Sequence, residues 1–239
     1  MKIIKRGRFE ILTPIEELRA QLLRIERAGR TCYQSEKGEI TQESAAKFIR
    51  KLLKSGHESV IEHSCLTVRF VDCGRGFTHE LVRQRLCAFS QESTRYVDYA
   101  KRGEGPDLDR FQVQCIAPPH RDTEAKVPLE DGRLYSFSDM VRDEEMFYRA
   151  LRKAGWVPED ARSILPTDLK AEIVITANFR EWRHIFKMRT QKAAHWQIRQ
   201  VMGDLLVELQ RILPGVFVDF VEAGKDQNGL RFFKQVPIE

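Results

Sequence analysis

The chain has 239 residues, 42% of them hydrophobic, which is enough for a sizeable core and argues against a disordered protein. Its 40 basic and 35 acidic residues give a formal charge of +5, spread along most of the length. This mild excess suits anionic ligands but lacks the concentrated basic stripe of a dedicated nucleic-acid-binding protein. No apolar run approaches the roughly 18 residues of a membrane helix, so neither a membrane span nor a membrane partner is predicted.

The cysteines and histidines give no metal-binding pattern. The five cysteines are odd in number, no pair has C-x-x-C spacing and no secretory segment precedes them, so we expect free thiols in a reducing cytoplasm. His57 and His63 are six residues apart, which puts them about 120° apart around a helix instead of on one face. The sequence therefore predicts a cytoplasmic protein without a metal site.

The first third of the chain is predicted to contain both short strands and amphipathic helices. Residues 1–12 are β-like, and a helix over 13–29 is predicted with Thr13 as its N-cap and Gly29 at its end. A second helix is expected from Gln42 to Lys54, ending at Gly56. A β-branched strand over 64–73 precedes a short helix from Thr78 to about Cys87, followed by a polar segment.

The rest of the chain is predicted to contain one long loop and four helices. Residues 101–133 are rich in Gly, Pro and charge and favour a surface loop; helices follow over 137–154 and from Pro158 to before Pro166. A strand over 170–178 ends at Asn178, an N-cap for a helix through Met188, and the clearest helix covers 196–213 before two last strands. Strands and helices do not alternate regularly, so we predict an α+β fold: a single domain, 1–239, with a central sheet flanked by helices.

The segment RQRLCAFSQESTRY, residues 83–96, concentrates polar chemistry. If Arg83 and Arg85 share a helix, they point about 200° apart and reach different groups. Ser93 and Arg95 offer a hydroxyl and a bidentate fork suited to phosphate. No G-x-G-x-x-G or Walker loop is present, so a nucleotide would not be held by a glycine-rich cradle. From these residues alone, a solvated basic helix with a polar loop is the more common alternative.

Cys87 raises the possibility of a nucleophilic thiolate, because neighbouring cationic groups lower the pKa of a thiol. A free cysteine is more often a small buried hydrophobic residue. A covalent cysteine mechanism therefore stays an alternative, and no Cys–His pair is evident from the sequence.

A second group of polar residues follows the segment ARSILP and the strand that ends at Asn178. Three arginines, an amide and a histidine form a candidate site for an anion and a heterocycle, with a solvated basic face as the rival interpretation; they are Arg162, Asn178, Arg180, His184 and Arg189.

These segments together resemble the flavin-dependent thymidylate synthases (ThyX). R-Q-R, seven residues and a serine resemble the family's R-H-R-x7-S signature. GHESVIEH, ARSILP and NFREWRHIFKMR resemble its flavin-side, central arginine and downstream segments, in the family's order over residues 30–220. The resemblance implies reductive methylation of dUMP to dTMP, with methylenetetrahydrofolate as carbon donor and FAD and NADPH as reductants, by a homotetramer with sites at its subunit interfaces.

The resemblance also implies roles for individual residues. FAD contacts are expected for Ser59, Arg83, Gln84, Arg85, Gln91, Asn178, Phe179, Arg180 and His184. Contacts with dUMP are expected for Glu80, Leu81, Val82, Arg83, Gln91, Glu92, Ser93, Thr94, Arg95, Arg162 and Arg189. Arg189 is the expected catalytic residue, because a cation at the pyrimidine edge stabilises negative charge that develops on the ring.

Two departures from the family pattern leave the substrate open. Gln84 stands where the family has a histidine, and Gln197 stands where a glutamate is usual. The alternatives are C5-methylation of a related uridine nucleotide by the same chemistry, or a basic nucleic-acid-binding protein.

Overall fold

The computed structural model describes residues 2–35, 38–101 and 112–238. The chain divides into two compact units, each built from three separate segments. Unit 1 consists of Met1–Arg8, Val71–Leu81 and Gln91–Ile173; unit 2 consists of Phe9–Phe70, Val82–Ser90 and Val174–Glu239. The prediction of a single domain stays a prediction, and the units are described one at a time below.

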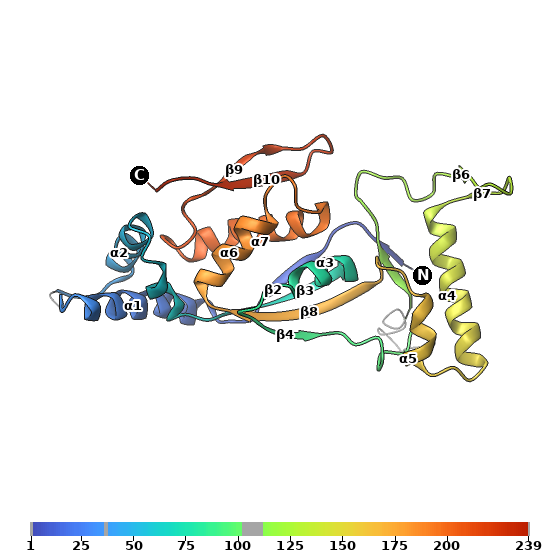
Figure 1. Ribbon diagram of the computed structural model, residues 1–239, viewed down its shortest axis with the longest axis horizontal. Helices are drawn as coiled ribbons and strands as arrows, with labels where there is room; N and C mark the ends of the chain where they lie inside the picture. Colours follow the sequence, from blue (N-terminus) through green and yellow to red (C-terminus); the bar gives the residue numbers. More distant parts are fainter. Residues whose placement is uncertain (1, 36–37, 102–111, 239) are drawn as a thin grey trace. The chain divides into compact units, whose positions relative to one another are not determined.

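Strands β2, β3, β8 and β4 form a four-stranded sheet in that order (Figure 1). Their bounds are Arg8–Ile11, Leu66–Gly74, Lys170–Ala177 and Ala88–Gln91. Strand β8 alternates strictly between half-buried and buried residues, as a strand with one apolar face does. Mixed helices and strands without regular βα alternation confirm the predicted α+β class.

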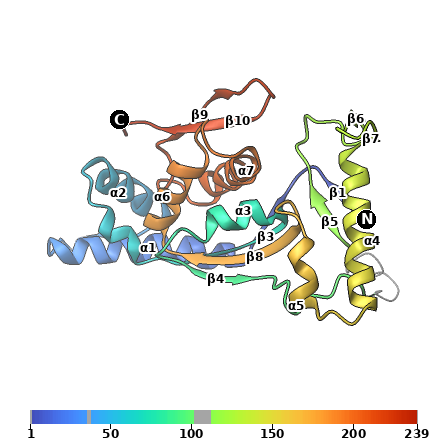
Figure 2. The same cartoon turned by 45° about the vertical axis from the view of Figure 1, so that its right-hand side comes forward.

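Unit 1 packs helices around a small core of its own. The α4 helix contacts α5 and η3, and β1 pairs in parallel with β5 in the register Lys2↔Gln114 to Ile4↔Ile116 (Figure 2). The core includes Tyr99, Cys115, Val141 and Tyr148. The elements of this unit are β1 (Lys2–Ile4), α3 (Arg75–Leu81), β5 (Gln114–Ile116), β6 (Val127–Pro128), β7 (Leu134–Tyr135), α4 (Phe137–Lys153), α5 (Pro158–Ala161) and η3 (Arg162–Ile164).

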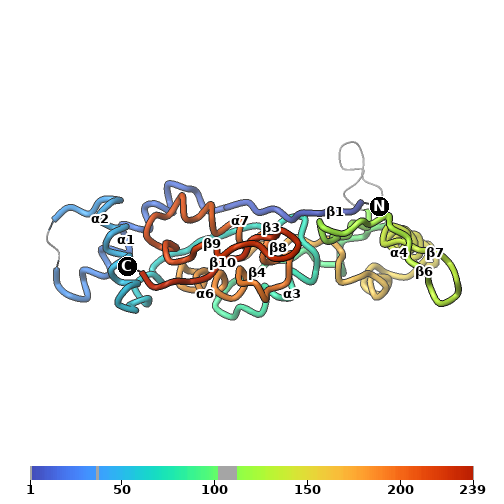
Figure 3. The backbone as a smooth tube through the Cα atoms, turned by 90° about the horizontal axis from the view of Figure 1, so that it is seen from above, coloured from blue at the N-terminus to red at the C-terminus, as the bar shows by residue number. Residues whose placement is uncertain are grey.

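Unit 2 packs several helices and a C-terminal hairpin. The α1 helix contacts α2, α6 contacts η1 and α7, and α7 contacts β10. Strands β9 and β10 run side by side as an antiparallel hairpin (Figure 3). The elements are α1 (Ile15–Cys32), α2 (Gln42–Lys54), η1 (Glu58–Glu62), α6 (Phe179–Arg189), α7 (Trp196–Ile212), β9 (Phe220–Lys225) and β10 (Arg231–Gln235).

Most predicted elements are confirmed, but two helix ends are not where we expect them. Thr13 does not cap α1, because its hydroxyl accepts a hydrogen bond from Thr67 N at 2.9 Å and so belongs to the sheet. Gly29 does not end α1, which continues to Cys32. A Cβ at Gly29 would lie 2.4 Å from the Phe48 ring, so this glycine is explained by the close approach of α2.

Two further predictions are corrected. The helix expected from Thr78 to Cys87 begins at Arg75 and ends at Leu81, so Arg83 and Arg85 do not share a helix. The predicted loop over 101–133 contains β5 and β6, and Cys115 is fully buried. Its residues 102–111 lie outside the described residues.

The turn after α7 depends on a glycine that meets the backbone of α2. Gly215 has φ +104°, and a Cβ there would lie 2.6 Å from the Ala46 carbonyl oxygen. Gly56 also has a positive φ, +72°, but nothing lies within 4 Å of its Cβ position. We expect Gly215→Ala to lower the free energy of unfolding by about 1–3 kcal/mol more than Gly56→Ala, because overpacking adds to the shared backbone strain. Denaturant unfolding of both variants measures this difference, and equal losses would contradict the close approach.

Candidate functional site

A polar cavity of about 830 Å³ opens in unit 2 between α6 and η1. Its volume suits a sizeable ligand, and both positive and negative side chains face it. The lining residues are Glu58, Glu62, Leu86, Asn178, Arg180, Glu181, Arg183, His184, Lys187 and Gln235. Three of the expected flavin residues, Asn178, Arg180 and His184, are thus brought to one cavity together with the acidic residues of GHESVIEH.

Helix α6 is oriented into this cavity by its N-cap. The Asn178 side chain accepts a hydrogen bond from Glu181 N at 2.8 Å, as predicted from the sequence. On the first turn, Arg180 donates to Glu62 at 2.5 Å and lies 3.9 Å from Glu58. These carboxylates neutralise an arginine that is half exposed to solvent.

Arg183, one turn further along α6, is buried and holds the cavity wall together. Its guanidinium donates to both oxygens of Asp219, at 2.6 and 2.8 Å, and to the Val216 carbonyl at 2.6 Å. Burial raises the pKa of Asp219, but the hydrogen bonds and charge of Arg183 outweigh it and hold that pKa below its usual value. This pair is a structural element that the sequence analysis did not find.

The remaining expected flavin residues of unit 2 differ in exposure. Ser59 lies exposed in η1, and Phe179 is fully buried, with its ring edge-on to Phe217. Arg83 and Arg85 are exposed on either side of Gln84, which is only 5% exposed. Residues 82–87 are irregular chain of turns and bends before β4, so helical spacing does not set the directions of the two arginines.

Arg189, the expected catalytic residue, lies half-buried at the last position of α6. It is ten residues along the same helix from Phe179, so α6 carries the expected catalytic residue and the cavity residues Arg180 and His184.

In unit 1, most residues of the segment 91–95 make side-chain hydrogen bonds. Gln91 donates to the buried Thr78 hydroxyl at 2.9 Å, and Arg162 donates to Thr94 at 3.0 Å. Arg95 directs two N–H groups at one oxygen of Glu159, at 3.1 and 3.0 Å. Two arginines and the hydroxyls of Ser93 and Thr94 therefore belong to one contiguous polar surface of this unit.

Three expected substrate residues surround the end of α3. Glu80 is half-buried and Leu81 is fully buried, both within the helix. Val82, the first residue after it, is exposed.

Several residues that line the cavity were missed by the sequence analysis, including Lys187, Leu86 and Gln235. Gln235 comes from β10, which no motif connects with α6. Lys187, one turn beyond Arg183 on α6, could have been found from helical spacing alone.

Neither a metal centre nor a membrane helix is found in the described part of the chain. Among residues 2–35, 38–101 and 112–238, no three His, Cys, Asp or Glu side chains come together in a way that could hold an ion. Within the same residues, no helix is long and apolar enough to cross a membrane.

Known proteins are similar to this chain in sequence. A family model described as "Thymidylate synthase complementing protein" matches residues 15–215. A flavin-dependent thymidylate synthase of Mycobacterium sp. (strain JLS) is 32% identical over 210 residues, covering 82% of this chain and 78% of the relative. The enzyme of the same description from Mycobacterium tuberculosis (strain ATCC 25177 / H37Ra) is 31% identical over 206 residues, with the same coverage.

Two solved structures share the fold. Thymidylate synthase X from Helicobacter pylori, with FAD and dUMP, has a TM-score of 0.64 at 19% identity and covers 89% of this chain and 98% of its own. The UMP/dUMP methylase PolB from Streptomyces cacaoi, bound with 5-Br dUMP, has a TM-score of 0.63 at 19% identity, covering 91% and 95%.

The matches, together with the fold, define an enzyme of the methyltransferase class. The chain belongs to the flavin-dependent thymidylate synthase family. The family resemblance inferred from the four motif segments is thereby confirmed.

Cys87 does not have the environment of a nucleophile. It is half-buried, and burial, with a smaller contribution from Glu181, raises the pKa of its thiol to about 12. The thiol is therefore protonated at neutral pH, and only a thiolate attacks efficiently.

We expect Cys87→Ala to retain most of the methyl-transfer activity, because no thiolate is present to lose. Cys65→Ala, which removes an exposed thiol, is the matched control. Complete inactivation of a Cys87→Ala protein that still folds and still binds its cofactor would restore the covalent mechanism.

Proposed function

We propose that this chain methylates dUMP at C5. In this reaction dUMP, methylenetetrahydrofolate, NADPH and a proton give dTMP, tetrahydrofolate and NADP⁺, with FAD as the bound cofactor. The observation that carries the proposal is the cavity of unit 2, where Asn178, Arg180 and His184 meet the segment Glu58–Glu62. These are the motif segments that the family resemblance assigns to the flavin.

The donor set of the cavity fits a flavin dinucleotide. A diphosphate requires cations and N–H donors, and the wall offers Arg180, His184 and Lys187; the amides of Asn178 and Gln235 suit the polar edges of a heterocycle. These residues, with Arg83, Gln84 and Arg85 before β4, would hold FAD. When bound, FAD supplies the hydride that completes the methyl group.

The polar surface of unit 1 fits the phosphate monoester of dUMP. Arg95 and Arg162 carry guanidinium forks, which bind phosphate oxygens bidentately, and Ser93 and Thr94 add hydroxyl donors. Gln91 and the end of α3 from Glu80 to Val82 complete the proposed substrate contacts, and the place of Glu92 among the expected contacts is taken up in the next subsection.

Arg189 would act on the pyrimidine. A guanidinium at the ring edge stabilises the negative charge that develops when the ring nitrogen loses its proton, and this makes C5 a better nucleophile. Its half-buried position on α6 supports this role, because partial exclusion of water strengthens the interaction of a charge with its partner.

The proposed assembly is a homotetramer with sites at its subunit interfaces. An apolar groove of about 500 Å³ in unit 2, lined by Phe9, Ile11, Ile15, Val207 and Ile212 among others, supports contact with a second copy of the chain. Ile15 and Val207 there are 38% and 41% exposed. The native mass of the purified protein tests this assembly.

The experiment that tests the proposed function combines a spectrum with product analysis. We expect flavin absorption bands after incubation with FAD, and dTMP from dUMP when methylenetetrahydrofolate and NADPH are supplied. Arg189→Ala should keep the flavin bands and lose about 10²- to 10³-fold in methylation rate, as expected for one contact with a developing anion. A protein that takes up no flavin, or that methylates UMP in preference to dUMP, would refute the proposal.

Glu159 occupies the phosphate-binding fork of Arg95 in this structure, so it competes with the substrate. Both side chains are 50% exposed, and exposed pairs contribute up to about 1 kcal/mol. We therefore expect Glu159→Gln to tighten dUMP binding by up to about fivefold.

Asp160→Asn is the matched control for this prediction, since it removes the same charge from the neighbouring exposed position of α5. The measurement is a titration of both variants with dUMP at equal ionic strength. Equal tightening of dUMP binding in both variants would indicate a general charge effect. Unchanged dUMP binding in Glu159→Gln would show that Arg95 does not bind the phosphate.

A further inference from the structure

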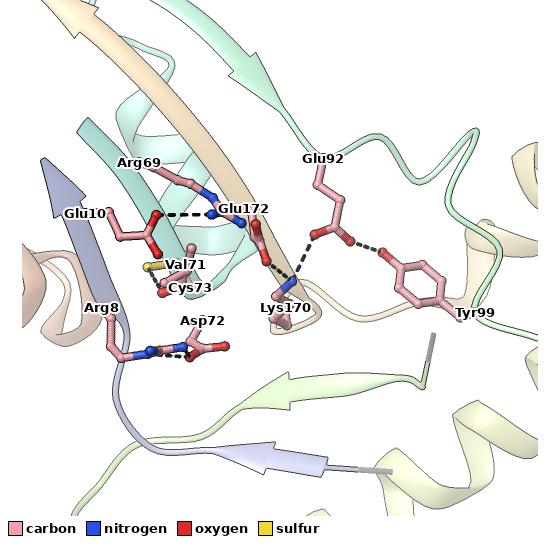
Figure 4. Close-up of polar contacts among 10 residues, drawn as sticks. All are labelled: Arg8, Glu10, Arg69, Val71, Asp72, Cys73, Glu92, Tyr99, Lys170 and Glu172. Carbon is pink, nitrogen blue, oxygen red and sulfur yellow. Dashed lines mark hydrogen bonds and ion pairs between the residues drawn. The ribbon is translucent and has the colours of Figure 1, made fainter. Parts of the chain in front are cut away.

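A lysine at the start of β8 lies between two carboxylates of unit 1 (Figure 4). Lys170 Nζ is 2.6 Å from Glu172 Oε1 and 3.2 Å from Glu92 Oε2. Lys170 and Glu172 point to the same face because side chains of a strand alternate with period two. Glu92 directly follows β4, so the ammonium of Lys170 joins the proposed substrate segment to strand β8.

The charge of Lys170 is retained despite its burial. Burial lowers the pKa of the ammonium, but hydrogen bonds and charges of Glu172 and Glu92 outweigh that effect and raise the pKa above its usual value. The Lys170 side chain is 18% exposed, so little water screens the interaction. A compact ammonium can donate to two carboxylates at once, which suits this narrow space.

The second oxygen of Glu92 is also engaged. The Tyr99 hydroxyl, on a side chain that is almost fully buried, donates to Glu92 Oε1 at 2.9 Å. Burial and the adjacent Glu92 carboxylate raise the pKa of Tyr99, so it stays a phenol and a donor. Both carboxylate oxygens of Glu92 therefore accept hydrogen bonds from within unit 1.

The main chain at Glu92 is held at the same place. Glu92 N donates to the Glu172 carbonyl at 2.8 Å. The next residue, Ser93, begins a tight turn in which its carbonyl accepts from Tyr96 N at 3.1 Å and Val97 N at 2.9 Å. The orientation of this turn, which carries Thr94 and Arg95, follows from how Glu92 is held.

We propose that Lys170 is a positioning residue for the phosphate-binding turn 93–95, acting through Glu92. The inference rests on the proposed function and refines it: Glu92 serves as the anchor of the turn and not as a ligand of the nucleotide. Lys170 and Tyr99 each donate a hydrogen bond to one oxygen of the Glu92 carboxylate. The turn that carries Ser93, Thr94 and Arg95 is therefore ordered before the phosphate binds, and binding does not bear the entropic cost of ordering it.

Steady-state kinetics of Lys170→Met and Lys170→Arg test the role. Lys170→Met keeps most of the side-chain volume but leaves two carboxylates facing each other, so we expect the KM for dUMP to rise about tenfold while kcat and flavin content are unchanged. Lys170→Arg keeps the charge and should recover most of the loss. Lys126→Met, which removes a lysine–carboxylate pair with Asp139 elsewhere in unit 1, is the matched control and should leave the KM unchanged.

Tyr99→Phe provides a milder variant that removes only one donor to Glu92, and we expect a rise of about threefold in the KM for dUMP with kcat unchanged.

Hydrogen exchange at the Tyr96 and Val97 amides gives a readout independent of activity. Exchange should be faster in Lys170→Met and Tyr99→Phe than in wild type or Lys126→Met. A KM for dUMP that is unchanged in both variants, or a loss confined to kcat, would overturn the positioning role.

The two hypotheses fail differently. Wild-type protein that binds flavin but gives no dTMP would overturn the proposed function. The exchange rates would then still decide whether Lys170 orders the turn. Normal wild-type activity with unaltered exchange in Lys170→Met would overturn the inference alone.

Discussion

The buried pair of Arg183 and Asp219 is the interaction on which the candidate cavity depends. Both side chains are less than 5% exposed, and removing one partner of such a pair typically costs about 3–5 kcal/mol because the other charge is left buried. Arg183 lies on α6 and also reaches Glu58 of η1 at 3.3 Å, while Gln235 of β10 donates to Asp219 at 2.7 Å. One ion pair therefore fixes three elements of unit 2 that are far apart in sequence, and these elements form the walls of the cavity.

Strand β8 organises the polar residues in a comparable way through its two ends. At its start, the alternation of side chains presents Lys170 and Glu172 on one face. At its end, Asn178 caps α6 and so fixes where the helix that carries Arg180 and His184 begins. The segment KAEIVITAN thus contains both the start of the strand that contacts Glu92 and the N-cap of the helix that lines the cavity.

Local patterns were sufficient where local interactions decide the structure. The bounds of α2, the cap at Asn178 and the extent of α7 follow from 3.6-residue periodicity, capping side chains and a Pro–Gly stop. The errors arise where partners distant in sequence take over. Thr13 gives its hydroxyl to β3 instead of its own helix, and β5 exists because it pairs with β1, more than 100 residues away. For the same reason, resemblance to a family indicated the motif residues of the candidate site, but not Arg183 and Lys170. A charged side chain in a sequence is typical of a surface. Only the fold shows that these two side chains are enclosed.

Exposure separates the arginines that hold the fold from those that are available to ligands. Arg95 and Arg180 are 50% and 51% exposed and face carboxylates of Glu159 and Glu62, whereas Arg183 is 4% exposed and faces Asp219. An exposed ion pair contributes little because water solvates both partners nearly as well when they are apart, so a phosphate with more charge can displace the carboxylate at small cost. A buried pair cannot be exchanged in this way, since its partner would be left without water or a counter-charge. The acidic residue beside each exposed arginine therefore balances the positive charge locally, in unit 1 for Arg95 and in unit 2 for Arg180, and leaves the guanidinium exchangeable.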